Sequence, residues 1–378
     1  MNKNSILKKI YSLYLLCFFS IYQLNAFSVI SIYETDQVKI NGDADDPAIW
    51  INNININNSL VFGTDKYNGI YTYNLKAETL DFSPAGNINN IDIISDDISK
   101  TTLLFGSNRN DSSLDLWVLD NNKMNSDIES NTFKLPVKST LKGYADMIVY
   151  GVCSGHHEYF GNIAFITEDE GSRVQLWSYR DNLKLLHTFN NQDATQSEGC
   201  VYDSDNSTLF ISEEQDRGIL RAYKINKNLD FSAPIIIDTR SGNIVGDPEG
   251  VTIYKSNTNE GFVILSSQGN STLNIYNRRY PYNFINSFNI VGNGSIDAVT
   301  DTDGVDVVNN NLGPLFPKGM LVVQDGSNDG EGSIRKQIFK FVSKLCFIRY
   351  VISDCNDNCI CLILSLYFLI FFLSFSKF

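Results

Sequence analysis

The sequence predicts an all-β fold, a six-bladed β-propeller, from three observations. Six similar segments follow one another along the chain. Within each segment, β-branched and aromatic residues alternate between turn residues, and no long segment has helical periodicity. The spacing of the segments is close to the length of a four-stranded propeller blade. It is measured between six leading acids at intervals of 46, 54, 52, 51 and 54 residues, namely Asp46, Asp92, Asp146, Glu198, Glu249 and Asp303.

Each segment predicts the first three strands of one blade. A leading acid opens a short apolar strand, a second strand ends in polar residues, and a third strand is rich in Tyr, Trp and Leu. In chain order the strands are expected within residues 45–50 and 60–75, 90–95 and 103–120, 145–151 and 163–180, 197–203 and 209–225, 247–254 and 262–278, and 301–308 and 320–329.

Antiparallel pairing then predicts where the acids gather. The start of a first strand and the end of a second strand lie on the same face of the disc. A dense ring of carboxylates around a central channel needs neutralisation, and oxygen donors without histidine or thiolate suit calcium, with several ions expected. Taken singly, any of these acids could instead cap a turn in solvent. The predicted ring contains Asp45, Asp46, Asp92, Glu198, Glu213, Glu214, Asp247, Glu249, Asp301, Asp303, Asp306 and Asp325, with Gln268 and Asn328 beside them.

The charge of the chain agrees with a cation-binding protein. The 378 residues carry 43 acids and 30 bases, a formal net charge of -13, and 43% are hydrophobic. This balance argues against nucleic acid and anionic membranes as partners, while the apolar content suffices for a large core. We expect a monomer with a small-molecule ligand.

The two ends of the chain differ from the repeats. Residues 1–26 carry three lysines before an apolar run and end at "QLNA", as in a secretory signal peptide, which predicts an extracellular or periplasmic location. Residues 27–342 form the predicted propeller. In the tail, residues 343–378, the apolar run Cys359–Ser376 is long enough for a membrane anchor, and an artefact of the gene model is the alternative.

Only two cysteines, Cys153 and Cys200, lie in the body of the chain. Two buried thiols are the preferred interpretation, and a single disulfide is the alternative.

The ordered motifs resemble those of one family. They are "DADDPAIW", "NNIDI", "SEGCVYD" with "LFISEE", "DPEGVTIY", "SSQGNST", "DTDGVDVV" and "GPLFPKGMLVVQDG". The series is similar to the β-propeller phytases, which are calcium-dependent alkaline phytases, and it runs from about residue 36 to residue 342. The resemblance implies several calcium ions, some structural and some at an active face, which bind phosphates of phytate and activate water.

Site residues follow from the resemblance where the motifs match. The residues implied in catalysis are Asp45, Glu198, Glu214, Asp247, Glu249 and Asp306. The implied calcium ligands are Asp45, Asp46, Asp92, Glu198, Glu214, Asp247, Glu249, Gln268, Asp301, Asp303, Asp306, Asp325 and Asn328, of which Asp325 and Asn328 resemble the ligands of a structural calcium.

Phosphate binding is where the chain departs from the family. Lys66 and Tyr150 match phosphate-binding residues. An arginine of the family is replaced by Ile94, and a lysine is replaced by Asp169. Because Asp169 would repel phosphate, Arg109 is the candidate to compensate, with Arg173 as the alternative.

These observations predict a secreted, calcium-dependent phytase that hydrolyses phosphomonoesters of myo-inositol hexakisphosphate by attack of metal-activated water. A degenerate, non-enzymatic calcium-binding propeller is the main alternative, and a calcium lactonase is a weaker one. The histidines, at 156, 157 and 187, match no catalytic triad and no histidine acid phosphatase motif.

Overall fold

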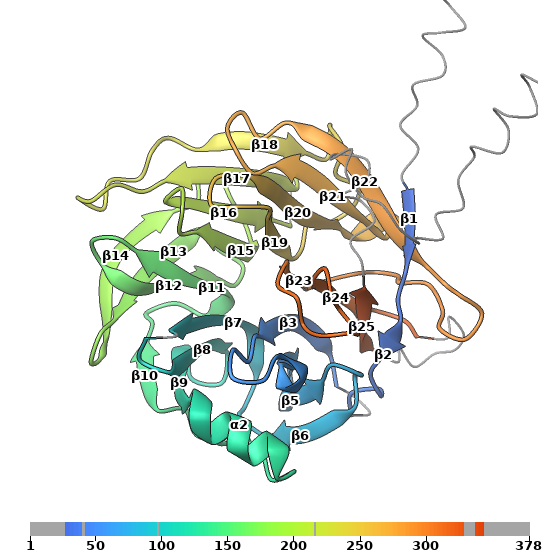
Figure 1. Cartoon of the computed structure of the whole chain (residues 1–378). Coiled ribbons are helices and arrows are strands. Elements are labelled where there is room, and N and C mark those ends of the chain that lie inside the picture. The colour runs from blue at the N-terminus through green and yellow to red at the C-terminus, as the bar shows by residue number, and fades with distance from the viewer. Residues whose placement is uncertain (1–26, 40–41, 97, 215–216, 329–336, 344–378) are drawn as a thin grey trace, which may run out of the picture.

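The predicted β-propeller is confirmed. The computed structural model describes residues 27–39, 42–96, 98–214, 217–328 and 337–343. Six sheets are arranged radially about one axis, and their inner strands β3, β7, β11, β15, β19 and β23 surround that axis (Figure 1). The predicted signal peptide and most of the tail lie outside the described residues.

The first three blades are four-stranded antiparallel sheets. From the axis outward, blade 1 consists of β3 (Ala44–Trp50), β4 (Leu60–Asp65), β5 (Gly69–Asn74) and β6 (Thr79–Ser83). Blade 2 consists of β7 (Ile88–Asp96), β8 (Thr101–Asn108), β9 (Ser113–Asp120) and β10 (Leu141–Tyr144). Blade 3 consists of β11 (Val149–His157), β12 (Gly161–Glu168), β13 (Arg173–Tyr179) and β14 (Leu183–Asn190).

Blades 4 and 6 are also four-stranded antiparallel sheets, and blade 5 has a fifth, parallel strand. Blade 4 consists of β15 (Ser197–Asp203), β16 (Thr208–Glu213), β17 (Ile219–Lys224) and β18 (Ile235–Thr239). Blade 5 consists of β19 (Val251–Lys255), β20 (Gly261–Ser267), β21 (Thr272–Asn277), β22 (Phe284–Val291) and β1 (Phe27–Ile30). Blade 6 consists of β23 (Val305–Val308), β24 (Met320–Asp325), β25 (Ile338–Ser343) and β2 (Tyr33–Glu34).

Helices are short in the described part of the chain. One α-helix, α2 (Asn121–Glu129), lies between β9 and β10 and begins after Asp120, whose side chain accepts from the Lys123 N–H at 2.9 Å. The 3-10 turns η1 (Ile56–Asn58) and η2 (Gln268–Asn270) are shorter still. None of the described helices has the length and apolar character needed to cross a membrane.

The ring is closed by the beginning of the chain. Tyr33 and Glu34 of β2 pair with Phe341 and Lys340 of β25, so a strand from near the N-terminus completes the last blade. β1 lies parallel to β22 at the outside of blade 5 (Figure 1). Backbone hydrogen bonds between strands far apart in the sequence therefore join blade 6 to the N-terminal segment.

Apolar clusters fill the spaces between neighbouring blades. Between blades 1 and 2, for example, Trp50 and Phe62 pack with Ile88 and Trp117, and all four side chains are at most 1% exposed. Equivalent clusters follow around the ring. This burial of apolar surface is the main force that holds the blades together.

The inner strands share a bulge that fixes which residues face the axis. In β3 the residue pair 45–46 lies opposite residue 64 alone, because Ala44 pairs with Asp65 and Pro47 pairs with Gly63. Blades 2, 3 and 4 have the same bulge at residues 89–90, 150–151 and 198–199. Residues 249–250 and 303–304 stand at the same place, immediately before the first pairs of β19 and β23.

This bulge corrects the predicted register of three leading acids. The structurally equivalent residues in blades 1 to 3 are Asp45, Asn89 and Tyr150, rather than the predicted Asp46, Asp92 and Asp146. Asp146 precedes β11, and its side chain is 78% exposed. The prediction aligned the six repeats by their acidic residues. The strand pairing shows instead that the equivalent residue of each blade is the one at the first position of the bulge.

The second bulge residue is glycine in blades 3 to 6, because the neighbouring blade lies very close. A Cβ atom on Gly151 would collide with the carbonyl oxygen of Glu198, and a Cβ on Gly250 would lie 2.8 Å from that of Asp303. Gly199 and Gly304 meet the backbone of the next blade in the same way. The glycines therefore permit close packing at the axis.

We expect Gly151→Ala to destabilise the fold. The backbone carbonyl of Glu198 cannot rotate away from an added methyl group, so the cost in unfolding free energy should be about 3 kcal/mol. Chemical denaturation measures it. The control is Asn90→Ala at the equivalent position of blade 2, which keeps its Cβ and loses one hydrogen bond, at a cost of about 1 kcal/mol. A loss for Gly151→Ala no larger than the control's would contradict the close-packing argument.

Candidate metal-binding active site

Two rings of residues lie on one face of the propeller. The inner ring consists of the first bulge residues, Asp45, Asn89, Tyr150, Glu198, Glu249 and Asp303. The outer ring consists of the residues that follow the second strands, Lys66, Arg109, Asp169, Glu214, Gln268 and Gly326. Backbone hydrogen bonds join outer-ring residues to the segments that lead into the inner ring. Lys66 N donates to the carbonyl oxygen of Asp43 at 2.8 Å, and Glu214 N donates to that of Gln196 at 3.1 Å, each two residues before an inner-ring residue.

Three glutamates from blades 4 and 5 converge. One carboxylate oxygen from each of Glu198, Glu214 and Glu249 lies within 4.8 Å of the other two. Glu198 and Glu249 are buried, and Oε2 of Glu198 has no hydrogen-bond partner among the described residues. Burial and the charge of Asp303 raise the pKa of Glu249 well above its usual range, and burial and the charge of Asp247 raise that of Glu214 to about 7. Such a cluster of closely spaced oxygen donors fits a divalent cation.

A lysine faces the acids of blades 1 and 6. Nζ of Lys66 lies 3.5 Å from Oδ2 of Asp45 and 3.8 Å from Oδ2 of Asp303. Burial alone would lower the pKa of Lys66, but the charges of Asp45 and Asp303 outweigh burial and raise it, so the ammonium stays protonated. Burial raises the pKa of Asp45 to about 7 despite this partner.

Three predicted ligands join neighbouring inner strands. The carboxylate of Asp306 accepts from Ile49 N at 2.8 Å, that of Asp46 from Ile91 N at 3.1 Å, and that of Asp92 from Ser154 N at 2.5 Å. Asp46 is buried and Asp92 and Asp306 are half-buried, and the loss of contact with water is the first cause that raises their pKa values. These acids therefore link blades 6, 1, 2 and 3, and their role as metal ligands stays a prediction.

The remaining predicted ligands near the rings lie at the rim. Asp247 has a side chain that is 44% exposed and ion-paired with Arg240. Nε2 of Gln268 donates to Oδ1 of Asp303 at 2.6 Å. Asp301 has a left-handed backbone conformation with φ of 46°, and its N–H donates to Oγ of Ser271 at 3.2 Å.

The predicted structural calcium ligands have a different surrounding. Asp325 ends β24, and its Oδ2 lies 2.8 Å from Nζ of Lys340, which is fully buried. The same ammonium contacts Asp297 and donates to the carbonyl oxygen of Ala298 at 3.1 Å. Asp325 thus has a cation beside it that the sequence did not predict. The prediction of calcium at Asp325 and Asn328 remains open.

A similar ion pair occurs in blade 4. Glu213, which was predicted in the ring, is buried and lies 3.4 Å from Nη1 of Arg221. Its carboxylate is thus paired with a side chain of β17 in the same blade, whereas the next residue, Glu214, belongs to the glutamate cluster.

The predicted phosphate-binding residues meet at blades 2 and 3. The guanidinium of Arg109 lies 5.3 Å from the ring centre of Tyr150 and donates to Oδ1 of Asn89 at 3.2 Å. Its Nη2 lies 2.7 Å from Oδ2 of Asp169. Burial and the charge of Glu214 raise the pKa of Tyr150, so its hydroxyl remains a neutral donor. Asp169 therefore partly neutralises the guanidinium of Arg109.

Ile94, which replaces an arginine of the family, is half-buried in blade 2. It lies within β7, pairs with Leu103 and packs against the apolar cluster between blades 2 and 3. An arginine there would place a charge against the core. Arg109, in the outer ring, instead places a guanidinium on the face that carries the two rings. Arg173, the alternative candidate for phosphate binding, is paired with Glu168, with Nε 2.8 Å from Oε1.

Sequence reasoning missed Asn89 and Arg240. Asn89 could have been found by aligning bulges rather than acids. Arg240 follows the fourth strand of blade 4, outside the repeated motif, and no sequence signal indicates its position beside Asp247.

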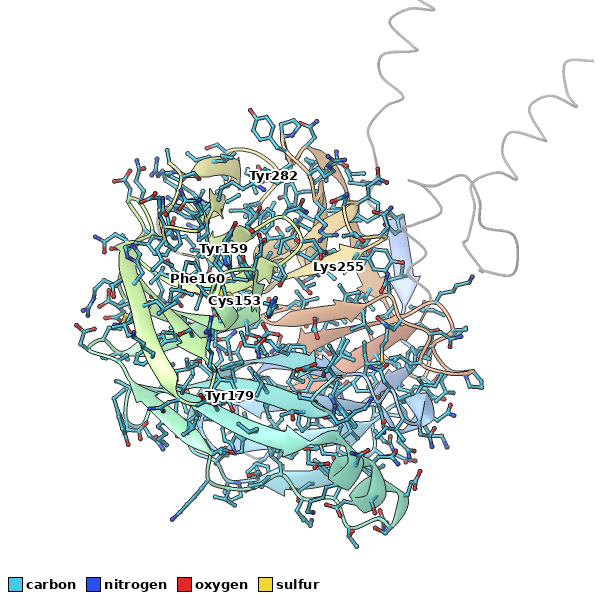
Figure 2. The ribbon with its side chains drawn as sticks, turned by 60° about the vertical axis from the view of Figure 1, so that its left-hand side comes forward. Cys153, Tyr159, Phe160, Tyr179, Lys255 and Tyr282 are labelled. Carbon is cyan, nitrogen blue, oxygen red and sulfur yellow. A yellow bond between two sulfur atoms is a disulfide. The ribbon has the colours of Figure 1, made fainter. Side chains whose placement is uncertain are left out.

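The preferred interpretation of the cysteines was wrong. Cys153 and Cys200 form a disulfide between the inner strands β11 and β15, with Cα atoms 5.5 Å apart (Figure 2). The two cysteines belong to different blades, so the pairing of strands within a blade does not bring them together. They meet because β11 and β15 lie side by side at the axis, and the sequence does not reveal this contact between blades. The bridge lies two residues after Glu198 and so ties β15 to blade 3.

The raised pKa values predict an unusual pH dependence. In protein freed of cations, Asp45, Asp92 and Glu214 have pKa values of about 7 in the folded state, above their usual values. The folded state then binds more protons than the unfolded state, so stability should rise as the pH falls from about 8 to about 5.5.

Thermal melting with a chelator measures this trend. Calcium needs the ionised carboxylates, so the increase in Tm on adding calcium should shrink over the same fall in pH. A Tm of the chelated protein that is lower at about pH 5.5 than at about pH 8 would contradict the electrostatic argument.

Comparison with known proteins agrees with this geometry. The phytase family model matches residues 5–357. A 3-phytase of Bacillus subtilis (strain 168) is 30% identical over 334 residues, which cover 84% of each chain. Among solved structures, a luciferin-regenerating enzyme shares the fold with a TM-score of 0.55 at 12% identity, over 85% of this chain and 96% of its own. An auxiliary nutrient binding protein from Bacteroides thetaiotaomicron does so with a TM-score of 0.51 at 11% identity, over 83% and 75%. The family match and the 3-phytase relative show that this chain belongs to the phytase family.

Proposed function

We propose that this protein is a calcium-dependent phytase that releases phosphate from myo-inositol hexakisphosphate. Membership of the phytase family supports the reaction, a metal-dependent hydrolysis of phosphomonoesters. The observation that carries the proposal is the convergence of Glu198, Glu214 and Glu249 on the face that also presents Lys66 and Tyr150.

The donor set fits calcium. All candidate ligands around the cluster are oxygen donors, and Glu198 Oε2 is buried without a hydrogen-bond partner in the described part of the chain, while Asp45 Oδ2 is buried 3.5 Å from Nζ of Lys66. Cations would be held by the glutamate cluster together with Asp45, Asp247 and Asp303. When bound, they supply positive charge that offsets the repulsion between phosphate and an attacking water and lowers the pKa of that water.

The residues of the chain would position the substrate. Lys66 is a point charge held between blades 1 and 6, and the Tyr150 hydroxyl is a neutral donor beside Glu214. Arg109 offers a planar guanidinium that is suited to phosphate oxygens. These donors lie on the blade 1 to 3 side and the glutamates on the blade 4 and 5 side, which would orient a phosphate between them.

We also propose that the protein is exported. The Cys153–Cys200 disulfide supports an oxidising compartment. The apolar leader at residues 1–26 supports the same inference, with an extracellular or periplasmic destination.

A non-enzymatic calcium-binding propeller is the second candidate, because the ion pair with Asp169 makes the guanidinium of Arg109 less available to a phosphate group.

The test that separates the two candidates is phosphate release from calcium phytate by the purified protein, with and without a chelator. We expect release to need calcium and Glu198→Gln to slow it by about a hundredfold or more. Glu260→Gln, an exposed change in the loop before β20, is the matched control. Calcium binding without phosphate release would favour the second candidate.

Asp169→Asn should strengthen phosphate binding. The change removes a negative charge 2.7 Å from Arg109 and keeps the shape of the side chain, so the KM for phytate should fall by about three- to tenfold. Steady-state kinetics at saturating calcium measures it. Asp181→Asn, an exposed acid in the same blade, is the control. An unchanged or higher KM would show that Asp169 does not limit phosphate binding.

A further inference from the structure

Arg240 lies beside the candidate cation site and has no part in the function proposed above. It directly follows β18, whose last residue, Thr239, pairs with Ile219 of β17. Arg240 is therefore on the face that carries Glu214. Its own N–H donates to the carbonyl oxygens of Arg217 and Gly218, both at 3.1 Å.

The side chain of Arg240 joins two loops that carry predicted ligands. Its Nε donates to the carbonyl oxygen of Gly246 at 2.6 Å, and its Nη2 donates to the carbonyl oxygen of Glu214 and to the carboxylate of Asp247. A Cβ on Gly218 would lie 2.8 Å from both Cγ and Nε of Arg240, so the side chain passes directly over this glycine. Since the side chain is 30% exposed, the guanidinium remains within reach of solutes.

The charges at this point make Arg240 a competitor of a bound cation. Glu214 belongs to the glutamate cluster, and Asp247 is close enough to repel it. Arg240 offsets that repulsion by pairing with Asp247. A divalent cation among the same acids would offset it more strongly, and it would weaken the Arg240 pair because both cations attract the same carboxylate.

Lys66 shows the same arrangement on the opposite side of the rings. It is paired with Asp45 and Asp303, which are also predicted cation ligands. Two cationic side chains, one near each side of the candidate site, are thus held by acids that a metal ion would engage.

We propose that Arg240 is a further phosphate-binding residue that Asp247 holds until a divalent cation engages this carboxylate. A guanidinium released from Asp247 can donate two parallel hydrogen bonds to a phosphate group at the rim of the cluster. Cation binding and phosphate binding are then coupled through one side chain. This inference rests on the proposed function and adds a residue to its substrate site.

Arg240→Gln tests the proposal through binding rather than turnover. Calorimetric titration measures calcium binding to the chelator-treated protein, and inorganic phosphate is the second probe, with and without calcium. Since the competing charge is gone, the variant should bind calcium about three- to tenfold more tightly. In the presence of calcium, it should bind phosphate about tenfold more weakly.

Two further variants separate charge from geometry. Arg217→Gln removes the same charge from the neighbouring exposed loop position and should change either affinity by less than about twofold. Arg240→Lys keeps the charge, so calcium affinity should stay near that of the wild type, but phosphate should bind more weakly because an ammonium cannot form the paired hydrogen bonds.

Weaker calcium binding with a lower Tm in Arg240→Gln would assign Arg240 a purely structural role and overturn the proposal. Phosphate binding equal to that of the wild type would overturn it as well. Failure of the proposed function looks different, because the wild-type protein itself would then bind no calcium or release no phosphate from phytate.

Discussion

Repulsion between buried carboxylates governs the active face of this propeller. The inner ring and the residues just below it bury Asp45, Asp46 and Glu249 and leave Asp306 half-buried, and the loss of contact with water raises the pKa of each. Ionised groups in such a position need opposite charge or strong hydrogen bonds. Around them the structure supplies Lys66 and Arg240, as well as backbone N–H groups of neighbouring strands.

The bulge of the inner strands creates this concentration of charge. In blades 1 to 4 it turns one residue toward the axis, and residues 249 and 303 stand at the same place in blades 5 and 6. The glycine that follows in blades 3 to 6 lets the next blade approach within contact distance of the backbone. The Cys153–Cys200 bridge then joins blades 3 and 4 at the same level. A rigid scaffold of this kind holds the carboxylates near one another in spite of their repulsion, which is the preorganisation that a multivalent cation site requires.

Positive side chains are placed unevenly around the face. Lys66 and Arg109 come from blades 1 and 2, whereas the outer ring of blades 3 and 4 carries Asp169 and Glu214. The Arg109–Asp169 ion pair sits where these two halves meet. An anionic substrate would therefore meet positively charged side chains on one side of the face and carboxylates on the other, so that it would bind in a preferred orientation.

The sequence by itself determined the six repeats, the all-β fold and the gathering of acids on one face, because hydrophobic alternation and segment length are local properties of the chain. It also carried the family motifs that located Lys66, Tyr150 and the glutamate cluster. Only the tertiary structure decided that Asn89 and Tyr150 occupy ring positions, since a bulge shifts the pairing by one residue and spacing does not reveal it. The ion pairs of Asp325 with Lys340 and of Asp247 with Arg240, and the disulfide, likewise join residues whose approach depends on how strands and blades pack, which no local pattern encodes.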